Sequence, residues 1–119
     1  MSSNFKNVKK ILIPIDGSDY SMRAAEYGLG IAKMIDAQIM VVYVMDQTLL
    51  DQVLRVADRE DVERDLKKDG QQYINYVLKV AQKESVKAGS LLVKGRPFEQ
   101  IVHLAKELNM DLIVMGTSG

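Results

Sequence analysis

Four short runs of apolar residues place the strongest constraint on how this chain can fold. None of the runs alternates apolar with polar residues, as a strand with one solvated face would. They therefore predict strands that are covered on both faces, and such strands are usually parallel. The runs cover residues 11–15, 39–44, 91–93 and 112–115.

Helical patterns fill the sequence between these runs. In residues 21–35, apolar side chains recur at spacings of three and four and form one helical stripe, which Ser18 or Asp19 can cap. Gly28 and Gly30 fall inside this helix and cost it about 1 kcal/mol each relative to Ala. We therefore expect both glycines to allow close packing of the helix on the sheet.

Two further helices and a covering segment are also predicted. Residues 58–85 show a long amphipathic pattern, and a third helix begins at Pro97, whose fixed φ suits the first helical position, and ends at Asn109. Residues 46–57 contain too many apolar side chains for a freely solvated loop. We interpret this stretch as a mobile helical turn that covers a neighbouring part of the molecule.

The alternation of strands and helices predicts an α/β fold, an open parallel sheet with helices on both faces and right-handed crossovers. A length of 119 residues suits a single domain over residues 1–119. Pro14 cannot donate a hydrogen bond to a sheet, although the first strand of such a fold is normally central. Its place near the carboxyl end of the run, where pairing finishes, removes most of this conflict.

Composition narrows the classes of function. Sixteen basic and sixteen acidic residues give a formal net charge of zero, which disfavours binding to nucleic acid or to an anionic membrane. The chain has no cysteine, which excludes disulfides, thiolate metal sites and thiol nucleophiles. The polar residues 1–10 and the short apolar run after them match neither a signal peptide nor a membrane span, so we expect a cytoplasmic protein.

Candidate binding residues lie in the loops that follow the predicted strands, where ligands of open α/β sheets bind. Three of these four loops carry glycine, which lets backbone N–H groups approach phosphate oxygens. A phosphate ligand is therefore predicted, with plain turn glycines as the alternative. Neither a Walker motif nor Gly-x-Gly-x-x-Gly is present. The single histidine, His103, is expected to face solvent, and no catalytic triad or histidine-rich metal site can be built with it.

Four segments together resemble the universal stress protein family, and within it the group that binds ATP. They are KILIPIDGSDYS at residues 10–21, YVMD at 43–46, KGRPFEQI at 94–101 and DLIVMGTSG at 111–119. The resemblance implies a Rossmann-like fold of the adenine nucleotide alpha hydrolase type, with strand order 3-2-1-4-5. The last helix and strand of that fold would follow residue 119, so the domain is expected to be truncated at its carboxyl end.

The resemblance also implies a set of nucleotide-binding residues. The ATP-binding group carries Gly-x2-Gly-x9-Gly-Ser/Thr after the fourth strand, and the last glycines of this chain match its first half. Adenine would meet the end of the second strand, adenosine the end of the first, and ribose and phosphates the glycine segment. The residues at these positions are Pro14, Ile15, Asp16, Val44, Met115, Gly116 and Gly119, with Gly95 at the pocket border.

Three of these assignments have a plainer alternative that needs no ligand. Val44 and Met115 are apolar ends of strands that would be buried without any ligand, and Asp16 could be a turn or helix-capping carboxylate. Asp16, Asp19 and Asp46 could also gather around a Mg²⁺ ion that accompanies nucleotide phosphates.

The resemblance finally implies a function. On this basis we expect a cytoplasmic stress-response module that binds ATP and signals through a homodimer to an unknown regulatory protein. At most slow ATP hydrolysis is expected, because no residue is placed to activate water. The alternatives are a nucleotide-free dimeric interaction module that docks through the long helix, and a slow ATPase or phosphoryl-transfer enzyme.

Overall fold

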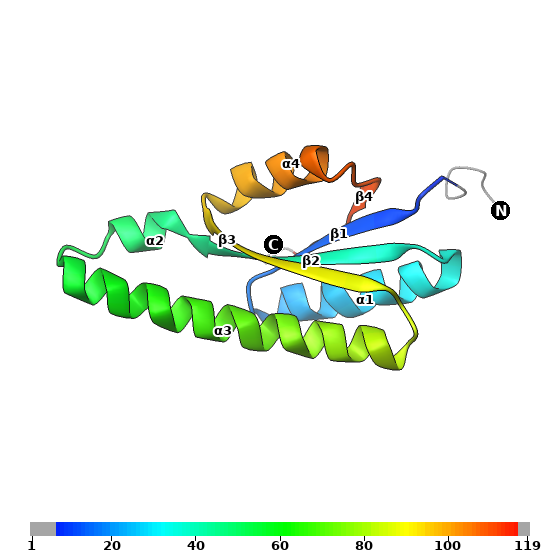
Figure 1. The fold of residues 1–119 in the computed structure, drawn as a ribbon, viewed down its shortest axis with the longest axis horizontal. Coiled ribbons are helices and arrows are strands. Elements are labelled where there is room, and N and C mark those ends of the chain that lie inside the picture. Colours follow the sequence, from blue (N-terminus) through cyan, green and yellow to red (C-terminus); the bar gives the residue numbers. More distant parts are fainter. Residues whose placement is uncertain (1–6, 117–119) are drawn as a thin grey trace.

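A four-stranded parallel sheet forms the centre of the computed structural model, which describes residues 7–116 (Figure 1). The strands are β1 (Lys10–Ile15), β2 (Gln38–Asp46), β3 (Ala88–Gly95) and β4 (Leu112–Ile113). Their order across the sheet is β3-β2-β1-β4. This confirms the predicted fold class and the order 3-2-1-4.

Helices cover both faces of this sheet, as predicted. Figure 1 shows α1 (Asp19–Ile35) and α3 (Val56–Lys83) below the sheet and α4 (Pro97–Glu107) above it. The short α2 (Gln47–Asp51) lies beyond the carboxyl end of β2. Ser18 caps α1, because its side chain accepts a hydrogen bond from the Ser21 N–H. Within residues 7–116, every helix is too short or too polar to cross a membrane.

Two apolar layers hold the helices to the sheet. Odd-numbered residues of β1, such as Ile11 and Ile13, point into the larger layer, between the sheet and helices α1 and α3. Leu12 points into the smaller layer, between the sheet and α4. All three side chains are fully buried. The central strand is therefore covered on both faces, which is why its sequence shows no alternation of apolar and polar residues.

Pro14 ends the pairing between β1 and β4. The carbonyl oxygens of Lys10 and Leu12 accept hydrogen bonds from the N–H groups of Asp111 (2.8 Å) and Val114 (3.0 Å). Pro14 is the next residue of β1 that faces β4, and it has no N–H to donate. Pairing with β2 continues beyond it to Ile15. The sheet therefore opens between β1 and β4 at its carboxyl end.

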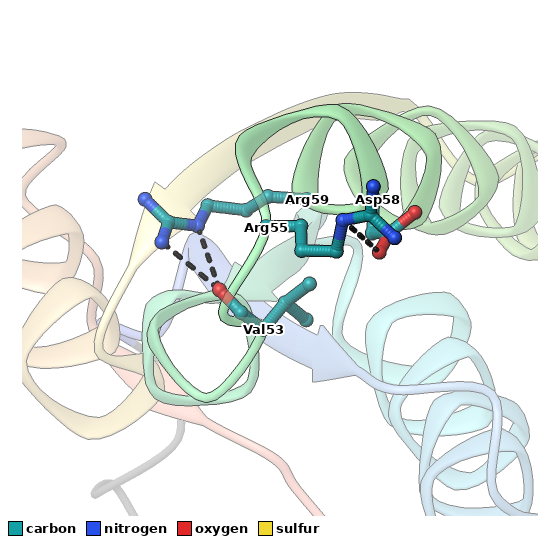
Figure 2. A network of polar contacts seen from close by, with 4 residues as sticks. All are labelled: Val53, Arg55, Asp58 and Arg59. Carbon is teal, nitrogen blue, oxygen red and sulfur yellow. Dashed lines mark hydrogen bonds and ion pairs between the residues drawn. The ribbon is translucent and has the colours of Figure 1, made fainter.

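The covering segment predicted at residues 46–57 contains α2 and the turn that leads into α3. Leu50 of α2 is buried, whereas Leu54 in the turn is 91% exposed. Figure 2 shows how the turn is fixed: the Arg59 guanidinium donates hydrogen bonds to the Val53 carbonyl from Nε (3.2 Å) and Nη2 (2.9 Å). Arg55, whose Nε lies 3.9 Å from the carboxylate of Asp58, points away from this contact.

The two glycines inside α1 differ in their surroundings. A Cβ on Gly28 would lie 2.5 Å from Cδ1 of Ile13, so Gly28 does allow close packing on the sheet. The same expectation is wrong for Gly30, where a Cβ would meet no atom within 4 Å. Two residues turn a helix by about 200°, so Gly30 faces solvent when Gly28 faces β1.

We expect Gly30→Ala to raise the free energy of unfolding by about 1 kcal/mol, because it removes the helix penalty of glycine without any clash. Gly28→Ala is the matched control in the same helix, and its gain should be smaller or negative because Ile13 must move. Urea unfolding followed by circular dichroism measures both. A Gly30→Ala protein no more stable than Gly28→Ala would contradict this account of α1.

Candidate functional site

A cleft of about 410 Å³ opens at the carboxyl ends of β1 and β2. It lies at the point where the sheet order reverses, with β2 on one side of β1 and β4 on the other. Ligands of open α/β sheets bind at this switch point, and the volume is within the range of small-molecule sites. The lining residues are Pro14, Ile15, Asp16, Ser21, Val42, Tyr43, Val44, Asp46, Leu49, Leu66, Pro97, Ile101, Met115 and Gly116.

Most of the residues expected from the sequence come together in this cleft. Pro14, Ile15, Asp16, Val44, Met115 and Gly116 all line it. Gly95 does not, because it lies at the end of β3, with β2 between it and β1, and packs against the Gln100 side chain. Gly119 lies outside the residues that the structure describes.

Other lining residues were not singled out from the sequence. Leu49 belongs to α2 and is 49% exposed, so the covering segment supplies an apolar wall. Pro97 and Ile101 reach the cleft from the first turns of α4. The contribution of Leu49 had one signal in the sequence, the apolar character of residues 46–57. The α4 contribution depends on how that helix crosses the sheet, which no local pattern records.

The loop between β1 and α1 forms the polar wall of the cleft. The Ser18 N–H donates a hydrogen bond to Oδ1 of Asp16 (2.8 Å), and the Asp16 N–H donates to the Ser21 hydroxyl (3.2 Å). The same hydroxyl donates to the Ser18 carbonyl (3.1 Å). Gly17 allows this tight turn because its φ is +86°, a region that other residues rarely adopt.

Two effects act in opposite directions on the Asp16 carboxyl. Burial raises its pKa, but hydrogen bonds, above all those from Ser18, lower it more, so the pKa lies below its ordinary value of 3.8. Asp16 is therefore a carboxylate at neutral pH and can accept hydrogen bonds from a ligand.

Gly116 closes the other side of the cleft. A Cβ at this position would lie 2.5 Å from the carbonyl carbon of Tyr20 and nearer still to its oxygen. The backbone after β4 therefore passes directly against the start of α1. Any larger residue at position 116 would push these two segments apart.

The charged lining of the cleft is acidic. Asp16 and Asp46 are its only charged residues among those that the structure describes, and Oδ1 of Asp46 accepts a hydrogen bond from the Thr48 N–H (2.9 Å). Within residues 7–116, no three acidic or histidine side chains are close enough to hold a metal ion, so Asp16, Asp19 and Asp46 do not form one cluster. His103 is exposed on α4, outside the cleft.

Comparison with known proteins gives a family match and several curated relatives, among them the following two. Residues 7–119 match the model of the universal stress protein family. A universal stress protein of Methanocaldococcus jannaschii is 39% identical over 111 residues, which cover 93% of this chain and 65% of that relative. The chain thus spans about two thirds of the length of this relative. The universal stress protein YxiE of Bacillus subtilis is 27% identical over 92% of this chain and 79% of its own length.

Solved structures show the same fold. A universal stress protein family member from Burkholderia pseudomallei superposes with a TM-score of 0.82 at 23% identity, over 98% of this chain and 85% of its own. An Arabidopsis thaliana member with AMP bound gives 0.73 at 18% identity, over 93% and 78%. A universal stress protein in complex with cAMP gives 0.68 at 23% identity, over 90% and 75%.

We expect the Asp16 carboxyl to titrate below pH 3.8 in the folded protein, as followed by carbon-13 NMR. Because the native state then binds this proton more weakly than the unfolded state, Asp16 stabilises the fold above that pH and loses this contribution as the pH falls through its lowered pKa.

Ser18→Ala keeps the backbone N–H but removes the hydroxyl, and with it the side-chain hydrogen bond that lowers the pKa of Asp16. The pKa should therefore rise, whereas Ser90→Ala on β3 should leave it unchanged. A pKa of Asp16 at or above 3.8 in the unchanged protein would contradict the hydrogen-bond account of the loop.

Proposed function

The chain belongs to the universal stress protein family, and from that premise we propose that it binds an adenine nucleotide in the cleft beside β1. The observation that carries the proposal is the cleft itself, which opens at the switch point of the sheet. Its floor is apolar, and its walls hold the Asp16 carboxylate and the backbone of Gly116, which passes directly against the start of α1. In this proposal the protein is a cytoplasmic regulatory module whose bound nucleotide is ATP.

The apolar part of the cleft suits a flat base. Val42 and Ile101 are buried in the layer between the sheet and α4, and half-buried Val44 lies beside them. Leu49 covers this surface from α2. Such a slot between apolar side chains excludes water from a heterocycle, and the backbone at the end of β2 supplies polar groups for its edge.

The polar part suits a ribose. Asp16 is ionised and lies on the β1–α1 loop, where its carboxylate can accept hydrogen bonds from sugar hydroxyls. Gly116 and the glycine segment that follows it would give the sugar and phosphates access to backbone N–H groups. The Arabidopsis protein with AMP and the protein with cAMP both bind ligands that contain adenosine, which agrees with recognition of that part.

The negative charge of the phosphates needs a positive partner, and the described lining of the cleft supplies none. No lysine or arginine of residues 7–116 lines the cleft, and two carboxylates do. ATP would therefore bring a cation such as Mg²⁺, held by the phosphates and by one or two of these carboxylates. The N–H groups at the start of α1, next to Gly116, also favour an anion.

Binding rather than turnover is the proposed role. The titratable groups that line the cleft are Asp16, Asp46 and Tyr43, and both carboxylates already accept hydrogen bonds from backbone N–H groups. We propose that nucleotide occupancy is transmitted through a homodimer to a regulatory protein. A nucleotide-free docking module is the second candidate, because Leu54 and Val56 expose apolar surface at the start of α3.

A thermal-shift experiment with AMP, ATP and GTP, with and without Mg²⁺, tests the proposal. A ligand at a hundredfold excess over its dissociation constant should stabilise the protein by about 2.7 kcal/mol. Val44→Phe should abolish the shift by filling the slot, whereas Val56→Phe, on the exposed start of α3, should preserve it.

The outcomes separate the candidate functions. No shift with any adenine nucleotide would refute nucleotide binding and leave the docking module. Equal shifts for the two phenylalanine variants would place the ligand elsewhere. ATP turnover well above background that Asp16→Ala abolished would identify an enzyme instead.

A further inference from the structure

We infer that Tyr73 of α3 is a positioning residue that holds the β1–α1 loop in place at the cleft. Its ring lies against the backbone of Gly17, the residue between Asp16 and Ser18. Tyr73 itself does not line the cleft. Its effect on a ligand therefore passes through the loop, and this consequence for nucleotide affinity rests on the proposed function.

The contact at Gly17 leaves no room for a side chain. A Cβ there would lie 2.9 Å from Cδ2 of Tyr73 and nearer still to two other atoms of its ring. The φ of +86° adds a second reason for glycine. A half-buried tyrosine ring thus presses on the backbone of the turn that carries the Asp16 carboxylate.

A second glycine contact fixes α3 relative to the sheet. A Cβ on Gly70 would lie 2.6 Å from Cε1 of Tyr43, so the ring of this β2 residue fills the place of a Gly70 side chain. Tyr43 is buried and lines the cleft directly. Gly70 lies in the middle of α3, where glycine costs about 1 kcal/mol relative to Ala, and the ring contact explains its presence.

The two contacts form one connected cluster. The rings of Tyr43 and Tyr73 lie 6.2 Å apart between centroids, with an angle of 34° between their planes. Gly70 and Tyr73 are three residues apart, so they lie on the same face of α3. A shift of α3 along the sheet would break both contacts at once. The positions of α3 and of the Asp16 loop are therefore set together.

The Ser18 amide reports on this loop without any ligand. Its N–H donates to Oδ1 of Asp16 across Gly17, so the bond is kept only while the turn is held. If Tyr73 holds the turn, shortening its side chain should open that bond locally. Amides in the centre of β2 should not respond beyond the change in global stability.

The experiment compares three variants by amide hydrogen exchange and AMP titration. Tyr73→Leu should speed exchange of the Ser18 amide by about tenfold and weaken AMP binding by a similar factor. Tyr73→Phe keeps the ring and should behave as the unchanged protein. Tyr76→Leu removes a 49% exposed tyrosine from the same helix, whose hydroxyl contacts Glu26 (3.3 Å), and should leave the loop unaffected.

Each outcome decides between the two hypotheses. Equal Ser18 exchange in Tyr73→Leu and Tyr76→Leu, after normalisation to β2 amides, would overturn the positioning role. If the unchanged protein bound neither AMP nor ATP while exchange still separated the variants, the proposed function would fail and the positioning role would stand. Should Tyr73→Leu not fold, Tyr73→Met replaces it in the same comparison.

Discussion

Hydrogen bonding of β1 to strands on both of its sides is the constraint on which the rest of this structure depends. Because β1 is central and both of its faces are covered, its buried residues, Ile11 to Ile15, are all apolar. Pro14 then ends the pairing on one side while pairing with β2 continues on the other. Pro14 therefore ends the pairing of β1 with β4 at the position where the cleft forms, and it lines that cleft.

The sequence allowed the fold and much of the cleft to be predicted, since both depend on patterns that survive without tertiary contacts. Four apolar runs separated by helical stripes lead to a parallel sheet, and the strand ends then identify one edge of it. Asp16 was expected there because it directly follows the first run, whereas Val44 and Met115 were expected there from the resemblance to the universal stress protein family. Residues 46–57 were recognised as a cover because they were too apolar for an ordinary loop.

The features that escaped prediction depend on how one helix is rotated or placed relative to another element. Gly28 and Gly30 look alike in the sequence, and only the rotation of α1 separates the packed glycine from the exposed one. Gly95 ends a strand that is not next to β1, so strand order removes it from the cleft. The contact of Tyr73 with Gly17 joins segments that no local pattern connects.

The contact between Arg59 and Val53 bears on how this part of the molecule can change in evolution. The guanidinium is bound by a main-chain carbonyl, a group that every amino acid carries. This contact therefore does not depend on which side chain stands at position 53, and the neighbouring Leu54 is exposed, so residue 54 can change while the contact is kept. Relatives could in this way acquire new binding partners at an exposed site without disturbing the neighbouring cleft.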